Sequence, residues 1–342
     1  MEAERKFMER AMDLALRGLG KVSPNPMVGC VIAHKGEVVG EGWHEYFGGP
    51  HAEVNAIESM KDKKILNRSK VYVTLEPCSH IGKTPPCTNV LIESGVKEVI
   101  IGLKDPNVLV NGTGIRQLES SGIKVKLGYM EEQAEEMNRR FVTFHLEKRP
   151  YIILKWAQTI NGFIAKENGD SKWISNEISR KLTHKWRTEE DAILVGAITA
   201  EIDNPKLTAR NWTGKNPIRV VLGNPKLHSE ANLLNGESKT WIFNSFRTGM
   251  DMNLAWIKFG KSTMLKETLR YLFENNVQSL IVEGGATTLK NFIDANLWDE
   301  ARVFTSPAVF KSGIKAPELN RRGHVQAVLG DDILTITRNY NG

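Results

Sequence analysis

His51, Cys78 and Cys87 are the residues of this 342-residue chain whose types and spacing best suit chemistry. One imidazole and two thiolates can bind a zinc ion and leave its fourth coordination position open, which is the arrangement of a catalytic site. Glu53 lies two residues after the histidine and is not needed as a ligand, so it is free to carry protons. The set predicts a zinc-activated water that attacks an amino-bearing ring carbon, with Glu53 as the catalytic proton shuttle.

The elements around these residues are expected to bring them together. Residues 51–60 predict a helix that begins at the histidine, and the apolar run 71–75 predicts a buried strand that leads into Cys78. The prolines before Cys87 favour a helix that starts there and continues to residue 94. Both thiols then lie near helix N-termini, where the helix dipole favours the thiolate that binds metal. The alternative, inert buried cysteines, does not explain why the histidine, glutamate and thiols occur in this order.

The rest of residues 1–147 predicts an alternating α/β domain. Asn25 lies in a stiff loop between two prolines. Turn chemistry alone would explain this residue, but beside a zinc site its amide can also read a pyrimidine edge. His44, taken alone, is more typical of a surface histidine or of one with satisfied hydrogen bonds than of a functional one. The expected elements are a helix over 4–19, a hairpin over 28–43, strands over 98–103 and 123–127, and a helix from Glu131 to about Leu146.

Residues 148–342 predict a second α/β domain. Helical patterns over 176–187 and 263–275 separate a series of buried strands, which indicates a mostly parallel sheet covered on both faces. Gly284 and Gly285 form a turn between a strand and a helix, where a phosphate could approach the backbone, although a plain tight turn is the simpler interpretation. The expected strands cover 151–156, 192–195, 218–222, 240–243 and 280–282.

Charge is divided unevenly between the two halves. Residues 1–147 hold 19 Lys and Arg against 20 Asp and Glu, a net charge of −1, and the remainder holds 27 against 20, a net charge of +7. A first half without positive balance is poorly suited to a nucleic acid, whereas a basic second half suits small phosphorylated ligands. No apolar run approaches the ~20 residues of a membrane span, and no signal peptide is recognisable, so a cytoplasmic enzyme is expected.

Together these motifs resemble the bifunctional riboflavin biosynthesis deaminase/reductase family, whose first half belongs to the cytidine-deaminase superfamily. The spacing of the cysteines supports this resemblance, because eight residues separate them here and nucleic-acid deaminases show Pro-Cys-x-x-Cys. The matching motifs are Asn25-Pro-Met-Val-Gly29, His51-Ala-Glu53, Thr74-Leu-Glu-Pro-Cys-Ser-His80, Gly82-Lys-Thr-Pro-Pro-Cys87 and Asp105-Pro-Asn107 in the first half, and Gly169-Asp-Ser-Lys-Trp-Ile174, Asp191-Ala-Ile-Leu-Val-Gly196, Asp203–Arg210 and Glu283-Gly-Gly285 in the second.

The resemblance implies a cytidine-deaminase-like three-layer α/β/α domain over residues 1–147 and a dihydrofolate-reductase-like α/β domain over residues 148–342. It implies two consecutive reactions on a small phosphorylated pyrimidine. The first is the Zn²⁺-dependent deamination of 2,5-diamino-6-ribosylamino-4(3H)-pyrimidinone 5′-phosphate. The second is the NADPH-dependent reduction of its ribosyl group to ribityl, which gives 5-amino-6-ribitylamino-uracil 5′-phosphate. A homo-oligomer is also expected.

The resemblance further implies the residues of each site. His51, Cys78 and Cys87 would bind zinc, and Glu53 would be the proton shuttle. The pyrimidine pocket would be formed by Asn25, His44, His80, Lys83, Asp105 and Asn107. The NADPH site would be formed by Ala157, Trp173, Thr199, Asp203, Gly284, Gly285, Ala286, Thr287, Thr288 and Leu289. The substrate of the reductase would be bound by Ser171, Arg187, Leu207, Arg210 and Glu283, with the two arginines as a clamp on its phosphate.

Two departures from the family pattern fall in the second half. The family commonly reads Ser-Leu-Asp-Gly where this chain reads Thr159-Ile-Asn-Gly162, and Asn204 stands where a second aspartate is frequent. They leave open a second hypothesis, a deaminase whose second domain is not catalytic. A third, a nucleic-acid deaminase with an accessory domain, is disfavoured by the long cysteine loop and the neutral first half. Sequence alone assigns no residue to the 2′-phosphate of NADPH.

Overall fold

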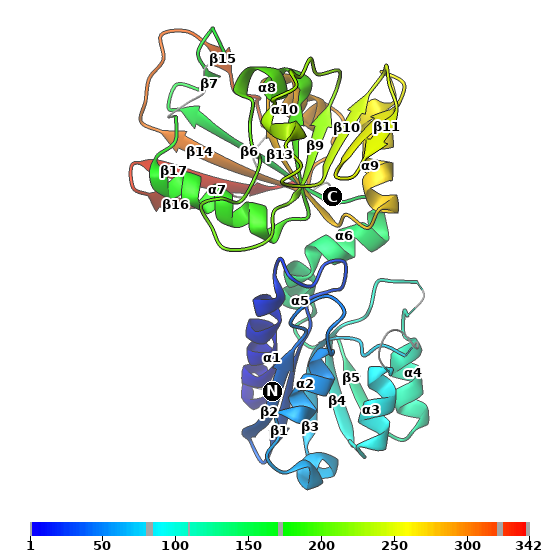
Figure 1. The fold of residues 1–342 in the computed structure, drawn as a ribbon. Helices are drawn as coiled ribbons and strands as arrows, with labels where there is room; N and C mark the ends of the chain where they lie inside the picture. The colour runs from blue at the N-terminus through cyan, green and yellow to red at the C-terminus, as the bar shows by residue number, and fades with distance from the viewer. Residues whose placement is uncertain (1, 80–84, 109, 170–173, 320–323, 340–342) are drawn as a thin grey trace. The chain divides into compact units, whose positions relative to one another are not determined.

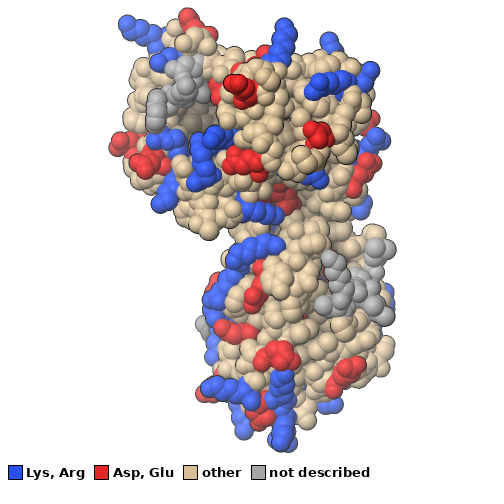
Figure 2. Space-filling model, in the orientation of Figure 1, with Lys and Arg blue, Asp and Glu red and all other residues tan. Residues whose placement is uncertain are grey.

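A computed structural model of the chain describes residues 2–79, 85–108, 110–169, 174–319 and 324–339. It divides the chain into two compact units, Met1–Lys148 and Arg149–Gly342 (Figure 1). No helix within the described ranges is long and apolar enough to cross a membrane. On the face shown in Figure 2, basic and acidic side chains are interspersed over both units.

The first unit is a five-stranded sheet in the order β2-β1-β3-β4-β5, with β1 antiparallel to both of its neighbours and β3, β4 and β5 parallel. One hydrophobic cluster joins the sheet to α1, α5 and α6, and another joins it to α2, α3 and α4, so the unit has three layers. The strands are β1 (Gly29–His34), β2 (Glu37–Trp43), β3 (Lys70–Leu75), β4 (Glu98–Leu103) and β5 (Lys124–Leu127). The helices are α1 (Glu2–Ala15), α2 (Ala52–Glu58), α3 (Cys87–Glu93), α4 (Thr113–Ser120), α5 (Glu131–Met137) and α6 (Arg139–Glu147), with 3₁₀ turns η1 (Leu16–Gly18) and η2 (Lys63–Arg68).

The prediction of one helix from Glu131 to Leu146 is wrong, because the chain breaks at Asn138 between α5 and α6. The Asn138 side chain is 2% exposed. Its Oδ1 accepts a hydrogen bond from the Met27 backbone N–H, and its Nδ2 donates one to the Met27 carbonyl, both at 2.9 Å. A buried amide must be satisfied in this way. The break therefore fixes the loop that carries Asn25, a link that helical periodicity cannot reveal.

The second unit is built on a ten-stranded sheet in the order β11-β12-β10-β9-β8-β13-β6-β14-β17-β16. The strands from β12 to β14 in this order are parallel, and β11, β17 and β16 are antiparallel edge strands. The strands are β6 (Tyr151–Thr159), β8 (Ala192–Gly196), β9 (Ile218–Leu222), β10 (Thr240–Asn244), β11 (Gly249–Asp251), β12 (Leu254–Lys258), β13 (Ser279–Gly284), β14 (Glu300–Ser306), β16 (His324–Leu329) and β17 (Asp332–Arg338). A short separate pair is formed by β7 (Phe163–Ala165) and β15 (Ile314–Lys315).

Helices cover both faces of this sheet, as predicted for a mostly parallel sheet. The side chains of α9 and α10 pack in one hydrophobic cluster, and those of α7 and α8 pack in two others. The helices are α7 (Glu177–Glu189), α8 (Ala197–Asp203), α9 (Met264–Glu274) and α10 (Ala286–Asp294), with a 3₁₀ turn η3 (Asn232–Leu234). The antiparallel strands after residue 300 were not predicted from the sequence.

Candidate metal centre and ligand cavity

His51, Cys78 and Cys87 meet in the first unit, where their ligand atoms all lie within 4.8 Å of one another. His51 Nδ1 is 3.2 Å from Cys87 Sγ and 3.5 Å from Cys78 Sγ. Nitrogen and sulfur ligands bound to zinc at ~2.1 and ~2.3 Å in a tetrahedron are separated by about 3.5 Å. The three atoms therefore fit one zinc ion and leave a fourth position for water or substrate.

Two short helices position the ligands. His51 is the N-terminal flanking residue of α2, and Cys87 is the first residue of α3. Cys78 follows β3, and its carbonyl accepts the Thr88 N–H at 3.2 Å while its Sγ accepts the Cys87 N–H at 3.4 Å. The predicted location of both thiols at a helix N-terminus is confirmed. The hydrogen bond from the Cys87 thiol, together with His51, lowers the pKa of the Cys78 thiol, which favours the metal-binding thiolate.

Glu53 lies in the first turn of α2 and is 3% exposed. Burial raises the pKa of its carboxyl group, and the nearby Cys78 sulfur adds to this effect. A carboxyl group that retains its proton more readily is better suited to both accept and donate a proton near neutral pH. The structure thus places the predicted proton shuttle beside the predicted metal ligands.

Asn25 and His44 form a hydrogen-bonded pair next to the metal ligands. Asn25 Nδ2 and His44 Nε2 are 3.0 Å apart, and His44 Nδ1 is 2.9 Å from the Pro50 carbonyl oxygen. The carbonyl can only accept, so Nδ1 carries the proton and Nε2 accepts from Asn25. Burial lowers the pKa of His44, which keeps the imidazole neutral. The rings of His44 and His51 meet edge to face with centroids 5.3 Å apart.

The segment after β4 is organised by Glu76, a residue that was not predicted from the sequence. Its buried carboxylate accepts backbone hydrogen bonds from Asp105 at 3.2 Å and Gly114 at 2.9 Å, and also from Gly112 and Ile115. The available sequence signal was an acid two residues before Cys78, in the run Glu76-Pro-Cys78. Asp105 also accepts a hydrogen bond from the Asn107 N–H. His80 and Lys83 lie outside the described residues.

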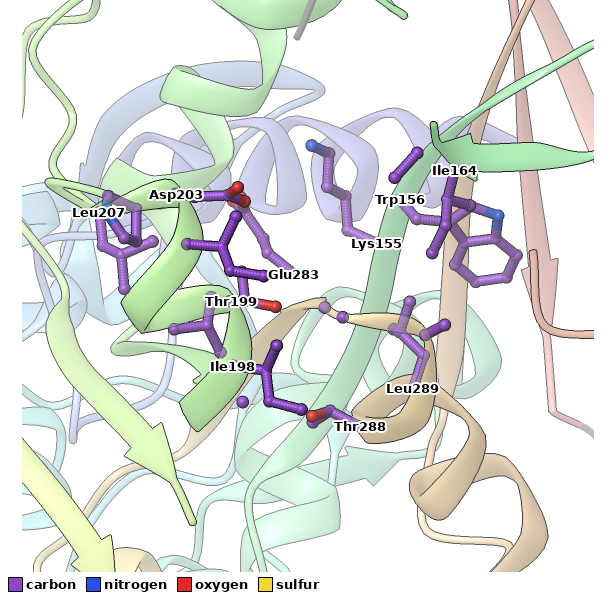
Figure 3. A pocket seen from close by; sticks show the side chains of 18 of the residues that line it. Lys155, Trp156, Ile164, Ile198, Thr199, Asp203, Leu207, Glu283, Thr288 and Leu289 are labelled. Atoms are coloured by element: carbon purple, nitrogen blue, oxygen red, sulfur yellow. The ribbon is translucent and has the colours of Figure 1, made fainter. Parts of the chain in front are cut away.

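A cavity of about 1350 Å³ lies in the second unit at the carboxyl ends of four adjacent parallel strands. Figure 3 shows Lys155 from β6 and Glu283 from β13 projecting into it, with Thr199 and Asp203 from α8. The lining includes most of the predicted NADPH residues, namely Ala157, Thr199, Asp203, Gly284, Gly285, Ala286, Thr287, Thr288 and Leu289, and the predicted substrate residues Arg187, Leu207, Arg210 and Glu283. Ser171 and Trp173 lie outside the described residues.

Lys155, Arg187 and Glu283 form a partly buried charged group that lines this cavity. Arg187 donates two hydrogen bonds to Glu283, from Nε at 3.0 Å and Nη2 at 2.8 Å. Burial alone would raise the pKa of Glu283, but the charges of Arg187 and Lys155 outweigh it and lower this pKa to about 2. Burial lowers the pKa of Lys155. Lys155 was not predicted from the sequence, because its only signal was a cation inside an apolar strand.

The glycine turn brings backbone close to the same cavity. Gly285 is the N-terminal flanking residue of α10, and a Cβ added to it would lie 2.9 Å from Thr199 Oγ1. A Cβ on Gly196, at the end of β8, would lie 2.3 Å from Thr288 Oγ1. Because these two strand ends carry glycines, no side chain fills this part of the cavity. The first N–H groups of α10 can then donate hydrogen bonds to a phosphate. These residues fit a phosphorylated dinucleotide.

The two departures from the family pattern have structural explanations outside the charged group. Asn161 Nδ2 donates to the Phe310 carbonyl at 2.7 Å, and its Oδ1 accepts from the Phe310 N–H at 3.3 Å and from Thr159 Oγ1 at 2.8 Å. An aspartate could not make the first bond. Asn204 ends α8 with φ 39°, a conformation that asparagine tolerates well, and it accepts two hydrogen bonds from Asn232. Neither side chain lines the cavity among the described residues.

Comparison with known proteins assigns both units. Residues 1–103 match the cytidine and deoxycytidylate deaminase zinc-binding region, and residues 150–320 match the RibD C-terminal domain. The riboflavin biosynthesis protein RibD of Aquifex aeolicus (strain VF5) is 38% identical to this chain, with 99% of each protein covered. The chain belongs to the RibD family. The RibD protein of Bacillus amyloliquefaciens is 41% identical, over 92% of this chain and 87% of that protein.

Solved structures of the RibD family agree with this assignment. A diaminohydroxyphosphoribosylaminopyrimidine deaminase/5-amino-6-(5-phosphoribosylamino)uracil reductase from Thermotoga maritima has a TM-score of 0.88 and 36% identity, covering 98% of this chain and 99% of that one. RibD of Acinetobacter baumannii has a TM-score of 0.89 and 30% identity over the same shares. The predicted pair of folds, cytidine-deaminase-like and dihydrofolate-reductase-like, is confirmed. The chain is a bifunctional deaminase and reductase of riboflavin biosynthesis, with Zn²⁺ and NADPH as cofactors.

Proposed function

We propose that this chain acts on the two compounds in the name of its Thermotoga maritima relative. It deaminates diaminohydroxyphosphoribosylaminopyrimidine and then reduces the resulting 5-amino-6-(5-phosphoribosylamino)uracil to the ribitylamino compound. One observation carries the proposal. A three-ligand metal centre with a buried carboxylate in one unit is joined in the same chain to a charged dinucleotide-sized cavity in the other. The product of the first site is the substrate class of the second.

In the first reaction, His51, Cys78 and Cys87 hold the zinc ion. With zinc bound, this site supplies an activated water for attack on the amino-bearing ring carbon. Glu53 accepts a proton from the water and delivers a proton to the nitrogen that leaves as ammonia. Asn25 holds the pyrimidine edge through its amide, since its Nδ2 is fixed by His44 and its Oδ1 remains to accept a hydrogen bond. His80, Lys83, Asp105 and Asn107 complete the pocket around the pyrimidine and its phosphate.

In the second reaction, bound NADPH would supply a hydride to C1′ of the ribosyl group, the sugar carbon bonded to the exocyclic amino nitrogen of the pyrimidine. Arg187 and Arg210 hold the substrate phosphate, with Ser171, Leu207 and Glu283 around the ribosyl group. Opening the ribosyl ring requires a proton on the ring oxygen, and the partly buried Lys155 beside Glu283 can donate it. The turn at Gly284 and the start of α10 hold the pyrophosphate of the cofactor, with Ala157, Trp173, Thr199 and Asp203 around its nicotinamide half.

We also infer that the substrate is a small molecule rather than a nucleic acid, that the chain works in the cytoplasm, and that it forms a homo-oligomer. The net charge of −1 over residues 1–147 supports a small-molecule substrate, because a nucleic acid would favour a basic unit. The biosynthetic role supports the cytoplasm. Size-exclusion chromatography with light scattering tests the third, and a single-subunit mass would contradict it.

The substrate assignment is tested by mass spectrometry of the reaction products. The purified protein with zinc and the diaminopyrimidine should release one ammonia per turnover and form a product one mass unit heavier. Addition of NADPH should raise that mass by two further units, because the ribosyl group gains two hydrogens. Release of ammonia from cytidine or deoxycytidylate, and none from the diaminopyrimidine, would contradict the proposal.

A further inference from the structure

The cavity of the second unit has chemically different ends. It spans the carboxyl ends of the neighbouring strands β6, β13, β8 and β9. Lys155 and Glu283 lie at the β6 and β13 side, and Leu222 and Gly223 lie at the end of β9. Three inter-strand steps of ~4.8 Å separate β6 from β9, or about 14 Å. An extended dinucleotide needs such a span to place its two rings at opposite ends.

The orientation of the dinucleotide follows from the reactive groups. The nicotinamide must lie beside Lys155 and Glu283, since these can act on the bound sugar. The glycine turn before α10 belongs to β13, in the interior of the four-strand span, where it can hold the pyrophosphate. The adenosine half then lies at the end of β9, near Gly223 and the beginning of α9, whose residues Met264 and Leu265 also line the cavity.

Lys261 is the cation at this far end. Six lysines and arginines line the cavity among the described residues, and five of them lie in β6, in α7 or in the segment after Leu207. Lys261 lies between β12 and α9 and is exposed. Within the described part of the chain it has no hydrogen-bond or ion-pair partner, so no carboxylate competes for its charge.

The acidic residues have the opposite distribution. Those that line the cavity, among the residues described, are Glu177, Asp203 and Glu283, from α7, α8 and β13. Glu283 lies close enough to Lys155 for their charges to interact, and Figure 3 shows Asp203 projecting into the cavity from α8. In dinucleotide sites an acidic residue beside the adenosine ribose selects NAD by binding its 2′-hydroxyl, and a basic residue there accommodates the 2′-phosphate. The β9 end offers a glycine and a lysine instead of an acid.

We infer that Lys261 binds the 2′-phosphate of NADPH and sets the preference of this enzyme for NADPH over NADH. The 2′-phosphate is a phosphomonoester with a charge of about −1.5 to −2 near neutral pH. An unpaired ammonium group at the rim of the cavity can meet it with a charge-assisted hydrogen bond. The inference rests on the proposed reductase function, because it places the reduced sugar beside Lys155.

The test measures equilibrium binding of NADPH and NADH by titration calorimetry, without substrate. Lys261→Gln should bind NADPH about 10-fold more weakly than the wild type, the loss expected for one charge-assisted hydrogen bond, and should bind NADH unchanged. Lys261→Arg should retain most of the NADPH affinity. The matched control is Lys266→Gln, which removes the same charge from an exposed position of α9 that does not line the cavity.

Two outcomes would overturn the inference while leaving the reductase function intact. Unchanged NADPH affinity in Lys261→Gln would show that the lysine makes no contact. An equal loss of affinity for NADPH and NADH would show that Lys261 contacts a group that both cofactors contain, and not the 2′-phosphate. Failure of the wild type to bind NADPH would instead contradict the reductase function itself. A further titration with 2′,5′-ADP, which carries the 2′-phosphate without the nicotinamide, should show the same 10-fold loss in Lys261→Gln if the adenosine half lies at the β9 end.

Discussion

The two units assemble their reactive groups in different ways. The metal ligands of the first unit come from residues 51–87, and each lies where a strand ends or a helix begins. The charged group of the second unit comes from distant elements, since Arg187 and Glu283 are 96 residues apart in the chain and 2.8 Å apart in space. A metal requires particular residue types at a recognisable spacing, whereas a charged cavity requires only that the sheet bring compatible charges together.

Removal of a metal ligand should have the largest effect, and it should abolish activity only in the first unit. Cys87→Ala removes one of three protein ligands, so we expect loss of bound zinc and of ammonia release, while NADPH binding in the other unit is unchanged. Metal content by mass spectrometry and cofactor titration check this. The control Cys30→Ala removes a buried thiol of β1 that is not a ligand and should keep its zinc. Full zinc occupancy in Cys87→Ala would refute the assigned ligand set.

The second unit should respond differently, because its active site is also part of its stability. Glu283→Ala leaves the partly buried Arg187 and Lys155 without their carboxylate, so we expect the second unit to lose about 3 kcal/mol of unfolding free energy as well as reductase activity. Denaturant unfolding followed by intrinsic fluorescence reports this unit, since seven of the eight tryptophans lie after residue 148.

The matched control for Glu283 is Asp294→Ala, which breaks an exposed ion pair with Lys290 and should cost less than about 1 kcal/mol. If Glu283→Ala were as stable as this control, the buried pair would not stabilise the unit. The double variant Arg187→Met with Glu283→Leu should recover part of the lost stability without recovering reductase activity, because it removes the charge of Arg187 and leaves only Lys155 without its carboxylate.

The unfolding free energy of the second unit should depend on pH through His184, an effect of intermediate size. His184 donates Nδ1–H to the Thr208 carbonyl at 2.9 Å, and burial and the charge of Arg187 lower its pKa from 6.5 to about 4. The unfolded chain therefore binds a proton on this residue at a higher pH than the folded chain does. Stability of the second unit should fall as pH decreases from 6.5 to about 4.

Replacement of His184 should remove this dependence. His184→Asn keeps a hydrogen-bond donor for the Thr208 carbonyl but cannot bind a proton. Between pH 6.5 and 4, its unfolding free energy should therefore depend less steeply on pH, by the equivalent of up to one bound proton. The exposed His228→Asn should retain the wild-type slope. An unchanged slope in His184→Asn would contradict a folded-state proton deficit at this residue.

The smallest expected effect concerns the asparagine that departs from the family pattern. Asn161→Asp loses only the hydrogen bond to the Phe310 carbonyl at an exposed position, so the cost should be about 1 kcal/mol or less. Reductase turnover should change by less than about threefold, because this side chain is not among the cavity-lining residues described. A large gain or loss of turnover would mean that residue 161 acts in the reaction.

Much of the fold and the metal centre could be predicted from the sequence, because apolar periodicity identifies strands and helices and a zinc site constrains residue type. The break at Asn138 was not predictable, since its cause is a pair of hydrogen bonds to Met27, more than a hundred residues away. Lys155 was missed for a related reason. A lysine in a buried strand carries no local signal, and its role depends on a carboxylate supplied by β13.

One chain carries two self-contained sites that act in sequence, and a complementation assay in solution is the sharpest test of this arrangement. Glu53→Gln and Lys155→Met are assayed alone and mixed, with the diaminopyrimidine, zinc and NADPH. We predict that Glu53→Gln neither releases ammonia nor oxidises NADPH, that Lys155→Met releases ammonia only, and that the mixture restores the ribityl product. NADPH oxidation by Glu53→Gln alone, or an inactive mixture, would show that the two sites do not act in this order.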